Sequence, residues 1–82
     1  MNYNPNMYKK AEILNLLANG LEMDAAELDE SSTRENTDAW DSVAHLSFLG
    51  LLEDRFPGIL DSYSELAKAK SVEEIFTTLT VL

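Results

Sequence analysis

The sequence lacks cysteine, contains only two prolines and three glycines, and carries six basic residues against fifteen acidic ones. Without cysteine there is neither a disulfide framework nor a thiolate metal site, so an apolar core must hold the fold, as suits a reducing cytoplasm. No apolar run approaches the roughly 20 residues that a membrane span requires, and the first ten residues contain no apolar block typical of secretory signals. We therefore expect a cytoplasmic protein that does not enter a membrane.

Charge and length narrow the function classes further. The net charge of −9 repels nucleic-acid backbones and anionic lipid surfaces, so neither is an expected partner. The acidity either steers the chain toward basic patches on protein partners or only keeps it in solution. A chain of 82 residues makes one domain and buries only about 60% of its surface on folding, which leaves little room for an enclosed catalytic pocket. We expect a monomeric, non-enzymatic domain.

Apolar residues recur at helical spacing, and no useful stretch alternates with period two. Asn4 and Pro5 have the form of an N-cap followed by proline in the first turn, and Asn19-Gly20 favours a helix end. Ser71 and Glu74 have the spacing of a capping box. These patterns predict an all-α fold, a small bundle of three main helices and one short helix in a single domain, 1–82. The expected elements are a first helix over about 5–19, a loop over 21–40, a second helix over about 42–56, a short helix over about 61–66 and a last helix over about 72–80.

The loop between the first two helices is the least regular part of the chain. Its composition is polar, and only Asp24–Glu27 has the pattern of a single helical turn. Loops of this length are uncommon in small domains and are usually functional. The loop leads into the stretch "DAWDSVAHLSFL", which places Asp41 and Ser42 at a helix start and His45 one turn later.

Asp41, Ser42 and His45 contain the side-chain types of a hydrolytic catalytic group, but not its order. In such a group the histidine lies between the serine and the acid, whereas here the acid is the immediate neighbour of the serine. No glycine-rich turn offers an oxyanion hole. A metal site is no better supported, because one histidine and scattered carboxylates match no ligand spacing. At the least, Asp41 or Ser42 caps the second helix.

A helical wheel at about 100° per residue divides the second helix into two faces. The face predicted to lie in the core holds His45, Phe48, Leu49, Leu52 and Phe56. The opposite face holds Val43, Ser47, Gly50 and Asp54, with Leu46 at the boundary. An outward valine beside a serine at the positive end of a helix indicates a surface that docks a partner.

Taken together, these features resemble those of the acyl carrier proteins, a family that includes peptidyl carrier domains. The resemblance rests on "WDSVAHLSFLGLLEDRF", on the polar loop before it and on the closing "KSVEEIFTTL". It implies that Ser42 receives a 4′-phosphopantetheine arm from coenzyme A through a separate phosphopantetheinyl transferase. The thiol of the arm would then carry an acyl or aminoacyl group as a thioester, so the cofactor would bring the thiol that this cysteine-free chain lacks.

The resemblance also implies roles for residues around Ser42. Asp41 would help to position the metal of the transferase and coenzyme A. The remaining contacts would be made by a partner face that loading and acceptor enzymes read. This face would comprise Val43, Leu46, Ser47, Gly50, Glu53 and Asp54.

Trp40 and Arg34 depart from the usual family pattern. Arg34 stands near the position of the expected loop anchor, and Trp40 replaces the glycine-containing pair that usually precedes Asp-Ser. We infer that Trp40 has taken over the anchoring and closes the core under the loop. His45 is expected to tie the loop to the second helix near Trp40, through a hydrogen bond to a loop carbonyl.

The outer face of the second helix bears on the pathway. Ala44 and Ser47 stand where fatty-acid carriers often have acidic residues, so we expect a carrier dedicated to one pathway, such as polyketide, nonribosomal peptide or surface-polysaccharide assembly. The alternative is a carrier-like helical module that binds a partner through Val43 and Leu46 and is never modified.

Overall fold

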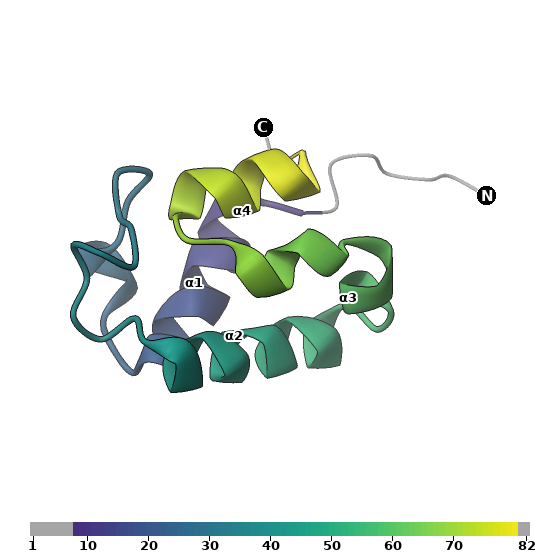
Figure 1. Cartoon of the computed structure of the whole chain (residues 1–82), viewed down its shortest axis with the longest axis horizontal. Coiled ribbons are helices and arrows are strands. Elements are labelled where there is room, and N and C mark those ends of the chain that lie inside the picture. The colour runs from purple at the N-terminus through teal and green to yellow at the C-terminus, as the bar shows by residue number, and fades with distance from the viewer. Residues whose placement is uncertain (1–7, 81–82) are drawn as a thin grey trace.

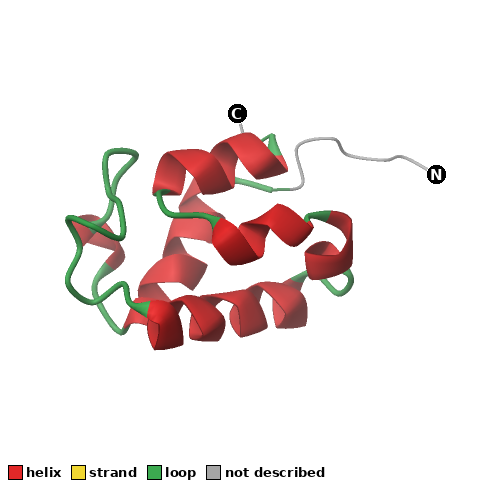
Figure 2. Ribbon diagram, viewed as in Figure 1, coloured by secondary structure: helices red, strands yellow, loops and turns green. Residues whose placement is uncertain are grey.

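The computed structural model describes residues 8–80. Figure 1 shows α2 running along one edge of the molecule, α4 along the opposite edge and α1 crossing behind both. The predicted all-α bundle is confirmed, since the described residues are helices joined by loops (Figure 2), and their one β feature is an isolated bridge between Thr33 and Ser71. The helices are α1 (Lys10–Leu21), the 3-10 turn η1 (Ala25–Glu27), α2 (Ser42–Arg55), α3 (Ile59–Ser62), the 3-10 helix η2 (Ser64–Lys68) and α4 (Val72–Leu79).

The start of α1 differs from the prediction. Asn4 and Pro5, the expected start, lie outside the described residues, but Lys9 is extended (φ −102°, ψ 141°) and α1 begins only at the next residue. The expected helical conformation is therefore wrong for residues 8 and 9. The cause is tertiary, because the ring of Tyr8 packs edge-on against Phe56, with the ring centroids 5.0 Å apart. This contact leads the chain into α1 in an extended form.

The predicted end of α1 at Asn19-Gly20 is also wrong. The helix continues through Gly20, and Glu22 ends it in the left-handed conformation with φ 58°. Gly20 serves helix packing instead, because a Cβ atom there would lie 2.7 Å from the backbone nitrogen of Phe48 in α2. The absent side chain lets α1 and α2 cross at close range, with Leu17 and Phe48 fully buried beside the crossing.

The short helix expected over 61–66 is two shorter elements, α3 and η2, separated at Tyr63 (φ −130°, ψ 63°). Helix α3 begins earlier than predicted because a side chain of α2 caps its start. The carboxylate of Glu53 accepts hydrogen bonds from the backbone N–H groups of Gly58 and Leu60, at 2.6 and 3.3 Å. Gly58 itself has φ 92°, a conformation that favours glycine.

The last helix, α4, confirms the predicted capping box, with one change. The Ser71 hydroxyl accepts from the Glu74 N–H at 3.0 Å, and the Glu74 carboxylate accepts from the N–H of Lys70 rather than from that of Ser71, at 2.8 Å. The helix ends at Leu79, one residue before the predicted end, and Thr80 is left-handed with φ 53°.

The expected long loop runs from η1 to Asp41 and is drawn in teal beside the start of α2 in Figure 1. Backbone hydrogen bonds fasten it to the segment that begins α4. The N–H of Arg34 donates to the carbonyl of Lys70 at 2.8 Å, and the N–H of Val72 donates to the carbonyl of Ser32 at 3.0 Å. These hydrogen bonds fix the path of the loop that leads to Ser42.

Candidate functional site

Ser42 is the first residue of α2, and Asp41 caps that helix. Asp41 has extended backbone, and its Oδ1 accepts a hydrogen bond from the N–H of Ala44 at 2.8 Å. Because Asp41 supplies the cap, the hydroxyl of Ser42 is not used for this purpose. Both side chains are exposed. The helix start thus presents a serine that is open to solvent.

The Ser42 hydroxyl contacts Arg34 rather than His45. Nη2 of Arg34 donates to Ser42 Oγ at 3.2 Å, across eight residues of sequence. Sequence reasoning missed this contact, since it assigned Arg34 only a place near the loop anchor. One signal was present: Arg34 is the only lysine or arginine between positions 11 and 54.

His45 uses both ring nitrogens elsewhere. The indole Nε1–H of Trp40 donates to Nδ1 at 3.0 Å, and Nε2 lies 2.9 Å from the carbonyl oxygen of Leu66. An indole N–H can only donate and a carbonyl oxygen can only accept, so the His45 proton lies on Nε2 and the ring is neutral. Its exposed fraction is 3%. Burial lowers the pKa of His45, and the charge of Arg34 lowers it further, against the opposing hydrogen bond to Leu66.

This geometry separates the three residue types that the sequence brought together. His45 has no ring nitrogen left for Ser42, and Asp41 binds the backbone of α2, so the side chains do not form a Ser-His-Asp group. Within the range that the structure describes, no group of three or more His, Cys, Asp or Glu side chains is arranged to hold a metal ion. No described helix is long and apolar enough to cross a membrane.

Trp40 is buried, with an exposed fraction of 2%, as its inferred role as loop anchor requires. Its ring stacks on that of His45, with centroids 6.1 Å apart and an interplanar angle of 24°. The expected tie between the loop and α2 is therefore present. The expected loop carbonyl is wrong: the carbonyl that pairs with His45 belongs to Leu66 in η2, because the Trp40 indole already occupies the nitrogen on the loop side.

The two faces of α2 are largely those that the wheel predicted. His45, Phe48, Leu49 and Leu52 are buried, and Phe56 is partly buried. On the outside, Val43 and Leu46 have exposed fractions of 73% and 67% and are the exposed large apolar side chains of the described residues. Ser47, Gly50 and Asp54 are also exposed. Large apolar side chains held in water beside a reachable hydroxyl are typical of a docking surface.

Glu53 differs from the other residues assigned to the partner face. Its side chain is half-buried, and its carboxylate caps the start of α3 through Gly58 and Leu60. Glu53 therefore has a structural role at the α2–α3 junction, and its place on the partner face stays a prediction. The sequence could not show this, because the partners follow a turn whose path depends on the fold.

A groove of about 750 Å³ lies between the loop and the start of α4. Arg34 belongs to it and also reaches Ser42, so the groove adjoins the helix start. The groove is lined by Thr33, Arg34, Glu35, Trp40, Lys70, Ser71 and Glu74.

The chain is not matched by any family model, curated protein or solved structure.

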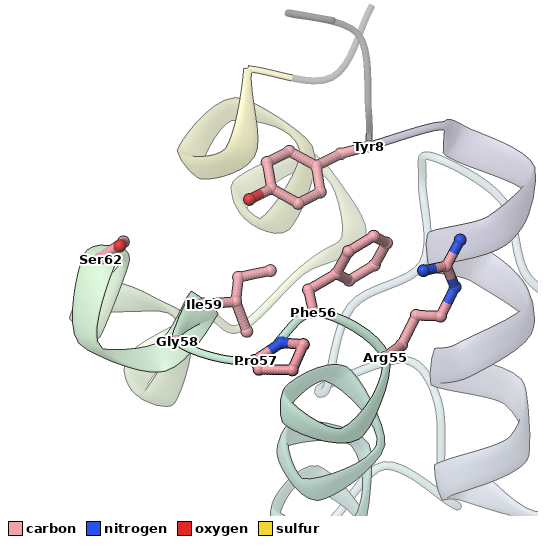
Figure 3. A pocket seen from close by; sticks show the side chains of 7 residues that line it. All are labelled: Tyr8, Arg55, Phe56, Pro57, Gly58, Ile59 and Ser62. Carbon is pink, nitrogen blue, oxygen red and sulfur yellow. The ribbon is translucent and has the colours of Figure 1, made fainter. Parts of the chain in front are cut away.

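A second hollow, of about 480 Å³, lies at the opposite end of α2. Figure 3 shows the Tyr8 ring above Phe56 and Ile59, with Arg55 turned toward α1. The Arg55 guanidinium pairs with Glu12 of α1 and lies 4.6 Å from the centroid of the Phe56 ring. At a rise of about 1.5 Å per residue, the length of α2 places this hollow about 20 Å from Ser42. It therefore plays no part in the site at the helix start.

Proposed function

We propose that the protein is an acyl carrier that holds an acyl or aminoacyl group as a thioester on a 4′-phosphopantetheine arm attached to Ser42. The observation that carries the proposal is the placement of the Ser42 hydroxyl. It is exposed at the start of a fourteen-residue helix, it is not used as the cap, and it lies beside two exposed apolar side chains. The proposal also rests on the resemblance of the sequence around Ser42 to that of acyl carrier proteins.

The attachment requires a nucleophile from this chain and activation from elsewhere. Ser42 Oγ would attack the phosphorus next to the pantetheine end of coenzyme A, forming a serine O–P bond. The phosphoanhydride bond breaks, adenosine 3′,5′-bisphosphate leaves, and the transferase takes the serine proton. This assignment does not require His45 as a base, and the His45 ring is neutral and bonded on both sides. When bound, the arm supplies a thiol for thioester exchange.

The surroundings of Ser42 support transient docking of partner enzymes. Val43 and Leu46 provide a small apolar patch, and the net charge of −9 favours encounter with basic surfaces. Asp41 uses Oδ1 as the helix cap, and its exposed carboxylate can also help position the metal of the transferase. The proposed partners are the transferase and the cytoplasmic enzymes that load and accept the cargo, in a pathway dedicated to polyketides, nonribosomal peptides or polysaccharides.

The sequence contains its own control for a test of attachment. Asp61-Ser62 is a second Asp-Ser pair, and Ser62 is also exposed. Wild type, Ser42→Ala and Ser62→Ala would be incubated with coenzyme A and a broad-specificity transferase, then compared by intact mass spectrometry. We expect one phosphopantetheine per chain on wild type and Ser62→Ala, and none on Ser42→Ala. A wild type that stays unmodified with several transferases contradicts the proposal.

The exposure of Val43 and Leu46 also favours a second candidate, an unmodified helical module that binds a partner through this patch. The two functions differ in their dependence on Ser42. Binding of a native partner that survives Ser42→Ala, in protein isolated from its source without an arm, favours the module. Loss of the interaction on Ser42→Ala favours the carrier.

A further inference from the structure

The backbone of Arg34 is held in place from two directions. Its N–H donates to the carbonyl of Lys70, and the adjacent Thr33 pairs with Ser71 in the isolated bridge. Thr33 and Asn36 also exchange hydrogen bonds, from the Thr33 N–H to Asn36 Oδ1 at 2.8 Å and from the Asn36 N–H to Thr33 Oγ1 at 3.0 Å. Arg34 therefore extends from a fixed point, and its contact with the start of α2 is part of the folded structure.

The guanidinium of Arg34 is paired with a hydroxyl rather than with a carboxylate. Residues 8–80 contain two ion pairs, Lys10–Glu30 and Arg55–Glu12, and Arg34 belongs to neither. Its side-chain hydrogen bond goes to Ser42 Oγ. A guanidinium has five N–H donors in a planar fork that matches the oxygens of a phosphate, and a single hydroxyl uses one of them. The positive charge of Arg34 and most of its N–H donors thus remain available beside Ser42 Oγ, the atom that the proposed function modifies.

We propose, on the basis of the proposed function, that Arg34 is a positioning residue that pairs with the phosphodiester of the arm on Ser42. On attachment, Ser42 Oγ becomes an ester oxygen of that phosphodiester. The two non-bridging oxygens, which share one negative charge, are bonded to the same phosphorus, so they come within reach of the guanidinium that already contacts Oγ at 3.2 Å. The contact between a cation and a neutral hydroxyl in the unmodified protein is replaced by an ion pair between guanidinium and phosphate, which can be bidentate.

The charges near Ser42 explain why such a residue is needed. The loop places Glu35, Asp38 and Asp41 close to Ser42 in the sequence, and the chain as a whole carries −9. A phosphodiester adds one more negative charge to this acidic segment. Arg34 supplies the opposing charge at the point of attachment, and does so from a half-buried position where salt screens it less than a fully exposed pair.

The same residue connects Ser42 to the groove between the loop and α4. This groove, of about 750 Å³, has the size of sites that hold small ligands. Its lining is mixed: polar side chains, including a second cation, Lys70, lie beside the ring of Trp40. Such a lining suits the pantetheine chain, in which amide groups alternate with short alkyl segments. Arg34 would therefore hold the phosphodiester at the mouth of the groove and direct the pantetheine chain along Trp40 and Lys70.

The test uses the modified protein and two substitutions of Arg34. Arg34→Gln keeps hydrogen-bond donors but removes the charge, and Arg34→Lys keeps the charge but removes the fork. The matched control is Lys9→Gln, which removes one exposed positive charge next to Tyr8, at the end of the molecule where Tyr8 packs against Phe56. The readouts are the ³¹P resonance of the arm, its correlation with the labelled arginine nitrogens, and nuclear Overhauser effects from pantetheine protons to the Trp40 indole.

We expect wild type and Lys9→Gln to share one phosphorus shift and the indole contacts. In Arg34→Gln the indole contacts should be lost, and the phosphorus shift should move to that of an unstructured phosphopantetheinyl peptide. The phosphorus shift of Arg34→Lys should lie between those of wild type and Arg34→Gln. Equal shifts in wild type and Arg34→Gln overturn this inference alone, as does an Arg34→Gln protein that takes no arm, which would place the residue in transferase docking. Absence of an adduct on wild type overturns the proposed function as well, so the two failures are distinct.

Discussion

The indole nitrogen of Trp40 donates a hydrogen bond to Nδ1 of His45, and the two buried rings stack on each other. The other ring nitrogen of His45 pairs with the carbonyl of Leu66. One side chain thus joins the loop, α2 and η2. The histidine in the "DSVAH" segment therefore contributes to the site by holding the segment in place.

Replacing His45 with alanine should destabilise the fold without removing the attachment site. The substitution leaves the Trp40 N–H and the Leu66 carbonyl without partners in the core and opens a cavity, which together cost about 2–4 kcal/mol. The free energy of unfolding in urea would measure the loss, with exposed Ser47→Ala in the same helix as control. Unchanged stability combined with loss of attachment would contradict the structural role.

Stability should fall as the pH drops below about 6.5. The folded-state pKa of His45 is lowered by burial below its ordinary value, so the unfolded chain binds more protons over this range. The contribution of neutral His45 is then complete above the unfolded pKa and is lost as the pH falls toward the folded one.

His45 is the only histidine in the chain, so one variant isolates this effect. Melting temperatures between about pH 8 and 5 should decline for wild type, and the decline should be smaller for His45→Gln, whose side chain does not titrate. Parallel curves for the two proteins would show that another group is responsible.

Two glycine-to-alanine substitutions should act in opposite directions. Gly20→Ala places a methyl group against the backbone of Phe48, forces α1 and α2 apart, and should cost about 1–3 kcal/mol. Gly50→Ala lies on the open face of α2 with no atom within 4 Å of the new Cβ, and should stabilise the helix by about 0.5–1 kcal/mol. Urea unfolding of both variants measures the contrast. Similar stabilities would refute the close crossing of the two helices.

A charge in the exposed apolar patch should impair docking and leave the fold intact. Leu46→Asp changes a side chain that is mostly in water, so the melting temperature should move little. Under the proposed function, kcat/KM of the transferase should fall by about tenfold or more, because one of the two apolar contacts is lost and a carboxylate would have to lose its water at the interface. Thr77→Asp, an exposed change in α4, is the matched control and should keep the rate.

Local signals were sufficient for much of the fold. The start of α2 follows from Asp41 as cap, and its inward face follows from the spacing of apolar residues, so both were predictable without tertiary information. The role of Gly20 could not be predicted in this way, because it depends on which helix crosses α1 and at which residue the two helices meet. The capping role of Glu53 was missed for a related reason, since its hydrogen-bond partners follow the turn at Gly58.

The contact between Arg34 and Ser42 was beyond sequence reasoning for a different reason. The two residues are separated by an irregular stretch whose path has no periodic pattern. That path is set by hydrogen bonds from the loop to Lys70 and Val72, residues almost forty positions further along the chain. Only the folded structure brings these segments together, so the sequence could single out Ser42 as a candidate but could not show the cation beside it.

Trp40 is the single tryptophan of the chain, and it touches both the imidazole of His45 and the groove beside Ser42. The protein therefore contains a built-in fluorophore at the point where its chemistry is proposed to occur. Protonation of the imidazole and occupation of the groove both change the surroundings of the same indole. Under the proposed function, its emission should follow attachment of the arm in real time, without any label.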